Sequence, residues 1–177
     1  MTNYAYNAVH HLKTINTHRR LVRQHCFKAG IPVQGLLHDL SKYNPVEFMS
    51  GVKYFQGDHS PNVEQRKATG YSAAWLHHKG RNKHHFEFWF DNSTTTFELV
   101  PVEMPVKYVK EMFCDRVAAS KVYHGDVYTD ATPLQYFSKM DYTKLMHPNT
   151  HALLKELLEM LAEQGEEATF RYLRTLK

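Results

Sequence analysis

Apolar residues recur at three- and four-residue intervals along most of the chain, a spacing that predicts amphipathic α-helices. The expected helices cover residues 4–28, 32–43, 45–55, 71–79, 105–123, 134–140 and 149–176. The breaks coincide with Gly30, with the Asn44–Pro45 step and with Gly80, and Gly165 interrupts the last helix. The pattern therefore predicts a mainly α protein.

The first two helices carry apolar positions that we expect to face the core. In the first helix these are Ala8, Leu12, Ile15, Val22 and Cys26. In the second helix they are Val33, Leu36, Leu37 and Leu40. Residues 56–70 are polar and contain Gly and Pro, which indicates a long loop. Residues 86–104 fit a small hairpin or an irregular insertion rather than a helix.

Length and composition indicate one globular domain. The 177 residues suit a single helical bundle over 1–177, with the candidate site in about 8–124 and C-terminal helices in about 133–177. The 42% hydrophobic and 13% aromatic content can build a core and excludes wholesale disorder. No apolar run is long enough to span a membrane, and the N-terminal residues do not resemble a secretion signal. Two distant cysteines cannot form a disulfide framework, so we expect a cytoplasmic protein.

Charge and histidine content narrow the chemistry. The formal net charge is +4, which suits an anionic substrate, but Lys and Arg are scattered, which argues against nucleic-acid binding. The chain has 13 His residues, and four of them lie between His77 and His85. Because neutral imidazole is the commonest metal ligand, the decisive question is whether these side chains meet carboxylates.

The most informative motif is the run His38-Asp39-Leu40-Ser41-Lys42. The His-Asp pair follows two leucines and precedes a third, so two ionisable groups lie near the apolar part of an expected helix. A buried charge without a partner is costly, and a metal ion would compensate it. The alternative is a helix-terminal pair at a solvated edge.

Two further residues lie on core-facing stripes of other helices. His18 is three residues after Ile15 on the first helix, where a hydrogen-bonded core histidine is the alternative to a ligand. Asp115 is three residues after Met112 on the helix 105–123, and Glu111, one turn earlier, competes for the same role.

The order His, His-Asp, Asp on three helices, with a lysine after the pair, resembles the HD-domain superfamily of metal-dependent phosphohydrolases. The motifs HDLSK and HHKGRNKHH resemble an uncharacterised branch of small bacterial and phage proteins with this pattern. The resemblance implies a helical bundle in which inward side chains hold one or two divalent ions. The implied metal ligands are His18, His38, Asp39 and Asp115, and Lys42 matches a lysine placed near the substrate phosphate.

The histidine-rich segment suggests an extension of this site. Many members of the superfamily add two histidines that create a second metal position, and His78 and His84 are our choices. Adjacent residues on a helix point about 100° apart, so we expect one of each adjacent pair to reach inward. The alternative is a basic rim in which Arg81, Lys83 and the histidines bind phosphate without contacting metal.

The expected activity is hydrolysis of a phosphomonoester or phosphodiester, with a nucleotide as the leading substrate. Asp39 and Lys42 would be catalytic, Lys42 with Arg81 and Lys83 would bind the substrate, and the metal would be Mn, Fe, Co, Ni or Zn. An HD-like di-iron oxygenase and a non-enzymatic, metal-containing binding protein are the rival hypotheses. We expect a small phosphorylated partner and no membrane contact, and a homo-oligomer stays open.

Overall fold

A computed structural model describes residues 3–177, which are mainly α-helical, as the sequence predicts. The α-helices are α1 (Tyr4–Lys28), α2 (Pro32–Leu37), α3 (Pro45–Tyr54), α4 (Pro61–Thr69), α5 (Ala73–Lys79), α6 (Val106–His124), α7 (Thr132–Phe137) and α8 (Pro148–Thr175). Short 3₁₀ helices are η1 (Leu40–Tyr43), η2 (Phe86–Phe88) and η3 (Gly125–Val127). Two strands, β1 (Phe90–Asn92) and β2 (Leu99–Pro101), complete the fold.

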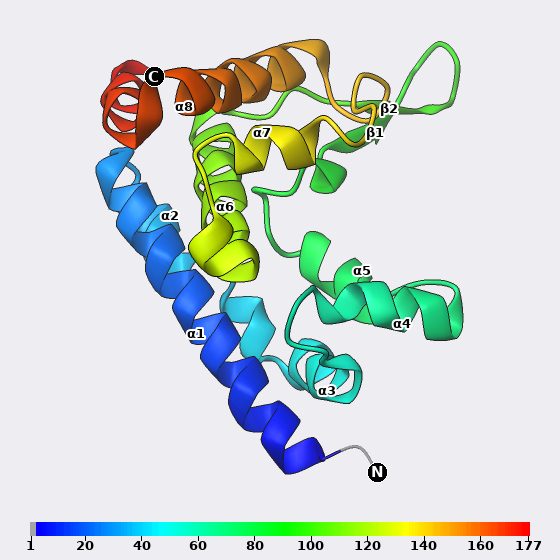
Figure 1. Cartoon of the computed structure of the whole chain (residues 1–177). Helices are drawn as coiled ribbons and strands as arrows, with labels where there is room; N and C mark the ends of the chain where they lie inside the picture. The colour runs from blue at the N-terminus through cyan, green and yellow to red at the C-terminus, as the bar shows by residue number, and fades with distance from the viewer. Residues whose placement is uncertain (1–2) are drawn as a thin grey trace.

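The helices are arranged around α1 and α6, which pack side by side (Figure 1). Helix α8 packs across one end of this pair, whereas α3, α4 and α5 form a group on the other side of the molecule (Figure 1). Apolar residues of α1, α6 and α8 make the main core. Among its fully buried members are Val22, Cys26, Phe113, Cys114, Val117, Leu154, Leu157, Leu158, Leu161 and Leu173. Both cysteines are free thiols.

The prediction for the second helix is wrong in two respects. Helix α2 ends at Leu37 instead of Tyr43, and the side chains of Val33, Leu36, Leu37 and Leu40 are exposed rather than inward. The cause is Gly35, which faces α1 so closely that a Cβ atom there would lie 2.7 Å from the Cβ of Cys26. Because α2 packs on α1 through a glycine, its larger apolar residues are turned away from the core.

The prediction of a loop over residues 56–70 is also wrong, because α4 lies within it. The Ser60 hydroxyl accepts a hydrogen bond from the Asn62 N–H, and Pro61 occupies the first turn. Gly70 ends the helix in the left-handed conformation at φ 81°. These residues are ordinary start and stop signals, and they outweigh the polar composition of the segment.

The insertion predicted near residues 86–104 is a two-stranded antiparallel hairpin, in which Phe90 pairs with Pro101 and Asn92 with Leu99. The break predicted in the last helix is present as well. Gly165 interrupts α8 with φ 79° and ψ 175°, a positive-φ conformation that glycine adopts without steric cost.

His25 is a core histidine outside the candidate site. Its ring lies against Phe170, and its Nδ1 lies 3.4 Å from the carbonyl oxygen of Cys114. Burial lowers the pKa of His25 from 6.5 to about 4. The folded protein therefore keeps this imidazole neutral at pH values where an unfolded chain would protonate it.

This shift gives stability a defined pH dependence. The contribution of neutral His25 is complete above about pH 6.5 and is lost as the pH falls toward about 4, because the unfolded chain gains the proton first. His25→Asn, whose amide can still donate to Cys114, should lose less unfolding free energy over this interval. Urea denaturation of the metal-free proteins at several pH values measures the difference. Parallel pH profiles for wild type and variant would contradict the expectation.

Candidate metal centre

His38 and Asp39 lie in a sharp turn between α2 and η1. His38 is extended, and Asp39 adopts the left-handed conformation at φ 53° and ψ 28°. A non-glycine residue in this region carries strain of about 1–3 kcal/mol, which persists only where the surroundings hold it. Both side chains are buried. The turn aims the Asp39 carboxylate into the molecule, which a continued helix would not do.

The four residues expected to hold a metal converge, and they are called the first group here: His18, His38, Asp39 and Asp115. Each contributes one ligand atom, and these atoms all lie within 4.8 Å of one another. The His18 Nε2 lies 2.9 Å from the Asp115 Oδ1, and the His38 Nε2 lies 3.4 Å from the Asp39 Oδ2. The side chains come from α1, from the turn after α2 and from α6.

A second group lies against the other side of Asp39. Its members are Asp39, His78, His84 and His85, with ligand atoms again within 4.8 Å of one another. The Asp39 Oδ1 lies 3.3 Å from the His78 Nε2 and 3.5 Å from the His84 Nε2. Asp39 is therefore shared, with Oδ2 toward the first group and Oδ1 toward the second.

The expectation that only one histidine of each adjacent pair reaches inward is wrong for His84 and His85. It assumed helical geometry, but both residues lie in the turn between α5 and η2, and His85 has an extended backbone at φ −86° and ψ 126°. The expectation holds for the other pair. His78 contributes to the second group, whereas the imidazole of His77 contacts the carboxylate of Glu47.

The buried atoms at the centre fit a metal ion. Several of them, namely the Nε2 atoms of His38, His84 and His85 and the Oδ1 of Asp39, make no hydrogen bond within the described residues. A buried polar atom without a partner costs about 1–3 kcal/mol. Mixed imidazole nitrogen and carboxylate oxygen suit divalent transition metals, so these residues can hold one or two ions.

Outer carboxylates fix the orientation of the histidines. The Glu111 Oε1 lies 2.9 Å from the Nδ1 of His38 and 3.1 Å from the Nδ1 of His84. Glu47 contacts the Nδ1 of His78 at 2.8 Å and that of His77 at 2.7 Å. An ionised carboxylate only accepts hydrogen bonds, so each Nδ1 donates and the Nε2 lone pair faces the centre. Glu111 thus orients His38 and His84, and these three residues form a further group whose potential ligand atoms lie within 4.8 Å of one another.

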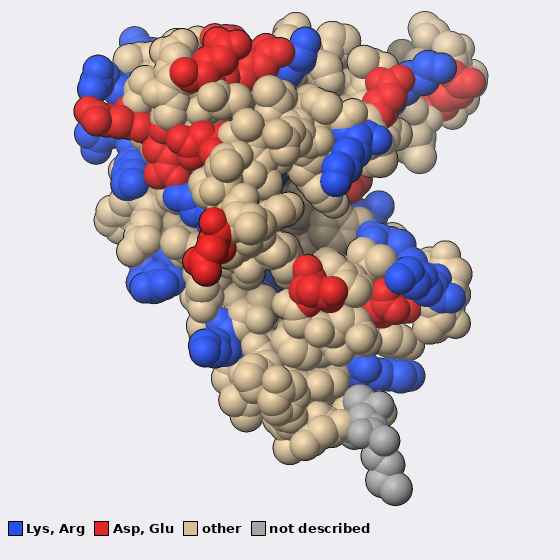
Figure 2. All heavy atoms as spheres, in the orientation of Figure 1, with Lys and Arg blue, Asp and Glu red and all other residues tan. Residues whose placement is uncertain are grey.

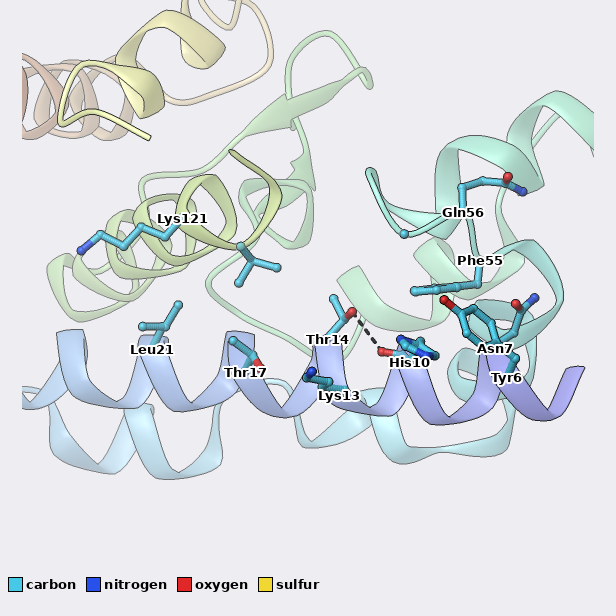
Figure 3. Close-up of a pocket in the computed structure, with 12 residues that line it drawn as sticks. Tyr6, Asn7, His10, Lys13, Thr14, Thr17, Leu21, Phe55, Gln56 and Lys121 are labelled. Atoms are coloured by element: carbon cyan, nitrogen blue, oxygen red, sulfur yellow. Dashed lines mark hydrogen bonds between the residues drawn. The ribbon is translucent and has the colours of Figure 1, made fainter. Parts of the chain in front are cut away.

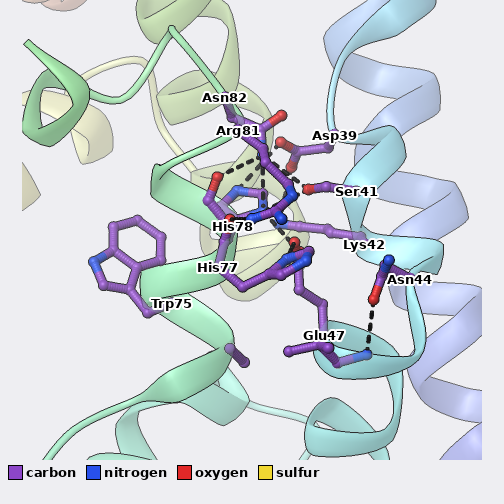
Figure 4. A network of polar contacts seen from close by, with 12 residues as sticks. Asp39, Ser41, Lys42, Asn44, Glu47, Trp75, His77, His78, Arg81 and Asn82 are labelled. Carbon is purple, nitrogen blue, oxygen red and sulfur yellow. Dashed lines mark hydrogen bonds and ion pairs between the residues drawn. The ribbon is translucent and has the colours of Figure 1, made fainter.

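A polar network around His78 continues this support (Figure 4). The Asn82 amide donates to the Ser41 hydroxyl and to the His78 carbonyl oxygen, each at 2.8 Å. The Ser41 hydroxyl lies 3.2 Å from the His78 Nδ1. Ser41 belongs to the turn that carries Asp39, so the network joins the two segments that form the second group.

The electrostatics of the centre favour a cation. Burial alone would raise the pKa of Asp39, but His38 and Lys42 hold it well below its usual range. Burial alone would lower the pKa of His38, but the Asp39 carboxylate raises it well above the ordinary value, so a metal ion that binds the His38 Nε2 would displace a proton from it. Burial lowers the pKa of His18 and of His85. The carboxylates thus stay ionised and attract positive charge.

Lys42 is paired with a carboxylate of the centre, because its Nζ lies 2.8 Å from the Asp39 Oδ2. The nearby Glu47 contacts histidines instead. Asp39 and Lys42 are three residues apart, and the 3₁₀ turn that follows Asp39 places both side chains on one side.

Arg81 and Lys83 do not reach the centre. Both are exposed; the Arg81 Nη1 donates to the His77 carbonyl oxygen at 3.3 Å, and the Lys83 ammonium lies over the Phe88 ring. His78 and His84 are buried, so they do not form the solvated basic rim that was the alternative. Whether the two basic residues bind substrate stays a prediction.

Fold and site together define a mainly helical protein with a buried His/Asp/Glu cluster that can hold metal. The chain belongs to a family of unknown function, DUF5662, whose model matches residues 7–160. That range includes all members of both groups. Comparisons with curated proteins and with solved structures found no match. No helix within the described residues is long and apolar enough to cross a membrane.

Proposed function

We propose that this protein is a metal-dependent phosphohydrolase or phosphodiesterase that acts on a nucleotide or a related phosphate ester. The observation that supports this proposal most is the sharing of Asp39 between two groups of ligand atoms. A carboxylate between two ion positions suits in-line displacement at phosphorus, where attacking and leaving oxygens both need stabilisation. The proposal also rests on the resemblance of the His, His-Asp, Asp order to the HD-domain superfamily.

Different sets of residues would bind the two metal ions. His18, His38, Asp39 and Asp115 would hold one divalent ion, and Asp39, His78 and His84, with His85 beside them, would hold the other. Bound ions would polarise the phosphoryl oxygens and lower the pKa of a coordinated water toward neutrality. Glu111 and Glu47 keep the imidazoles in the tautomer that presents Nε2.

The site opens toward Lys42. The exposed fraction is 30% for the Lys42 side chain, 18% for Asp115 and 10% for His18, whereas Asp39, His78 and His84 are closed to solvent. A phosphate ester therefore approaches from this side. A bound metal ion would neutralise the charge of the Asp39 carboxylate and so weaken its ion pair with Lys42. The Lys42 ammonium would then face the entering phosphate.

Lys42→Met should slow phosphate release about a hundredfold and leave the metal content unchanged, because it removes charge stabilisation without removing a ligand. The measurement is turnover together with elemental analysis, with Lys155→Met on the exposed side of α8 as the matched control. Unchanged turnover in Lys42→Met would refute the catalytic role. Loss of metal would assign Lys42 to the scaffold.

The activity itself is tested by elemental analysis of the purified protein followed by a phosphate-release screen. The screen covers nucleoside mono-, di- and triphosphates and phosphodiesters, with Mn, Fe, Co, Ni or Zn supplied to the metal-free protein. We expect release with at least one metal. Two irons per chain with oxygen uptake would favour the oxygenase, and full folding without metal or turnover would favour the binding protein.

A further inference from the structure

A groove of about 470 Å³ follows α1 beside the metal centre (Figure 3). The side chains of Tyr6, His10, Lys13 and Thr17 line it from α1. Phe55 closes it from the segment after α3, and Lys121 from the end of α6. In Figure 3, Lys121 lies at one end of the groove, and Tyr6 and Phe55 lie at the other.

The groove adjoins the open side of the metal centre. Thr14, which lines the groove, is one helical turn before His18 and shares its face of α1. Val122, which lines it from α6, is two helical turns after Asp115 and shares its face of that helix. A substrate whose phosphate reaches Lys42 therefore has the groove as the continuation of its path.

The lining suits a nucleotide chemically. It contains two lysines and a histidine and no carboxylate, so it favours anions. Lys13 makes no ion pair among the described residues, whereas the Lys121 ammonium is held by Glu166. The rings of Tyr6 and His10 lie 3.9 Å apart and 31° from parallel, and they offer a surface for a stacked base.

The groove is longer than a mononucleotide that has its phosphate at the metal centre. Residues Tyr6 to Leu21 of α1 line it, which corresponds to about 22 Å along the helix axis. The Tyr6 end lies about 18 Å along the axis from His18, which is beyond the reach of a mononucleotide whose phosphate is at the metal centre. On the face shown in Figure 2, acidic and basic side chains are interspersed, without the broad basic surface that a nucleic-acid polymer needs.

We propose that the groove binds the part of the substrate beyond the reacting phosphate, and that the substrate is a dinucleotide. This inference rests on the proposed function. One nucleoside lies near Thr17 with its phosphate at Lys42, and the second lies toward Lys13, with its base against Tyr6 and Phe55. The ester bond between that terminal phosphate and the first nucleoside is then the bond that water cleaves. The water oxygen bonds to phosphorus, and the nucleoside oxygen leaves with the proton that the water gives up.

The test measures binding without turnover. A phosphorylated thymidine dinucleotide, thymidine monophosphate and inorganic phosphate are titrated into metal-free protein by calorimetry. We expect the dinucleotide to bind at least about tenfold more tightly than the mononucleotide, since each stacked base contributes about 1–3 kcal/mol. Lys13→Glu and Tyr6→Ala should each weaken dinucleotide binding about tenfold. Both residues are exposed, so folding should survive, and a thermal melt verifies it.

Arg23→Glu is the matched control, because Arg23 is an exposed, positively charged residue on another face of α1. Equal affinity for dinucleotide and mononucleotide, or unchanged affinity in both groove variants, would overturn the inference. Dinucleotide binding without hydrolysis under any metal would support the groove and remove the proposed function. Hydrolysis of mononucleotides alone, with no effect of Lys13→Glu or Tyr6→Ala, would retain the function and remove the groove.

Discussion

Asp39→Asn should abolish binding of both metal ions, because a single carboxylate faces both groups of ligands. An amide offers one neutral oxygen and one nitrogen that does not bind metal, so the second group loses its only carboxylate and the first group keeps only that of Asp115. We expect both affinities to fall by more than about a hundredfold, which exceeds the usual effect of an outer-shell change. Elemental analysis after reconstitution measures the occupancy, and circular dichroism should show an unchanged helical signal.

Replacing Asp39 by asparagine separates the effect on metal binding from the effect on backbone stability. Asp39 has a positive φ, and asparagine adopts that conformation more readily than alanine does. Asp39→Ala should therefore add a loss of stability to the loss of metal. Asp91→Asn on the exposed strand β1 is the matched control and should bind like the wild type. Retention of either ion by Asp39→Asn would show that Asp39 is not shared.

The first group could be predicted because its members lie on periodic helices. His18 and Asp115 belong to the apolar stripes of α1 and α6, and a stripe determines which side chains face a neighbouring helix. The His-Asp pair could be placed near them for the same reason. Its exact geometry could not, because a left-handed aspartate has no sequence signal comparable to that of glycine.

The second group was only partly predictable because it lies where periodicity fails. His84 and His85 are in a turn, so helical spacing gave the wrong orientation for one of them. The outward orientation of the apolar side chains of α2 could not be predicted for a different reason. A rule that turns large apolar residues inward does not foresee packing through Gly35, where the two backbones approach each other.

Glu111 was visible in the sequence, and its role is more specific than a competition with Asp115. It precedes Asp115 by one turn of α6, so the two carboxylates share a face at different depths. The longer reach of glutamate places its oxygen on the Nδ1 atoms of His38 and His84. One carboxylate thereby orients one histidine of each group, and this arrangement links the two metal positions.

Glu111→Gln should therefore lower the affinity for both metal ions by about 10- to 100-fold, whereas Glu47→Gln should lower the affinity for the ion of the second group alone. A glutamine oxygen can accept from one Nδ1, but its amide nitrogen is a donor and faces the other donor unfavourably. The Glu47 carboxylate pairs with His77 and His78, and neither of these histidines belongs to the first group.

Titration against a chelating indicator resolves the two affinities, and nitrogen NMR of the histidines reports which ring nitrogen carries the proton. Glu98→Gln, on the exposed hairpin, is the matched control and should change neither. Similar losses at both positions in Glu47→Gln, or a loss at only one in Glu111→Gln, would contradict the assignment. In that case, the orientation of His38 and His84 would be fixed by packing rather than by a shared carboxylate.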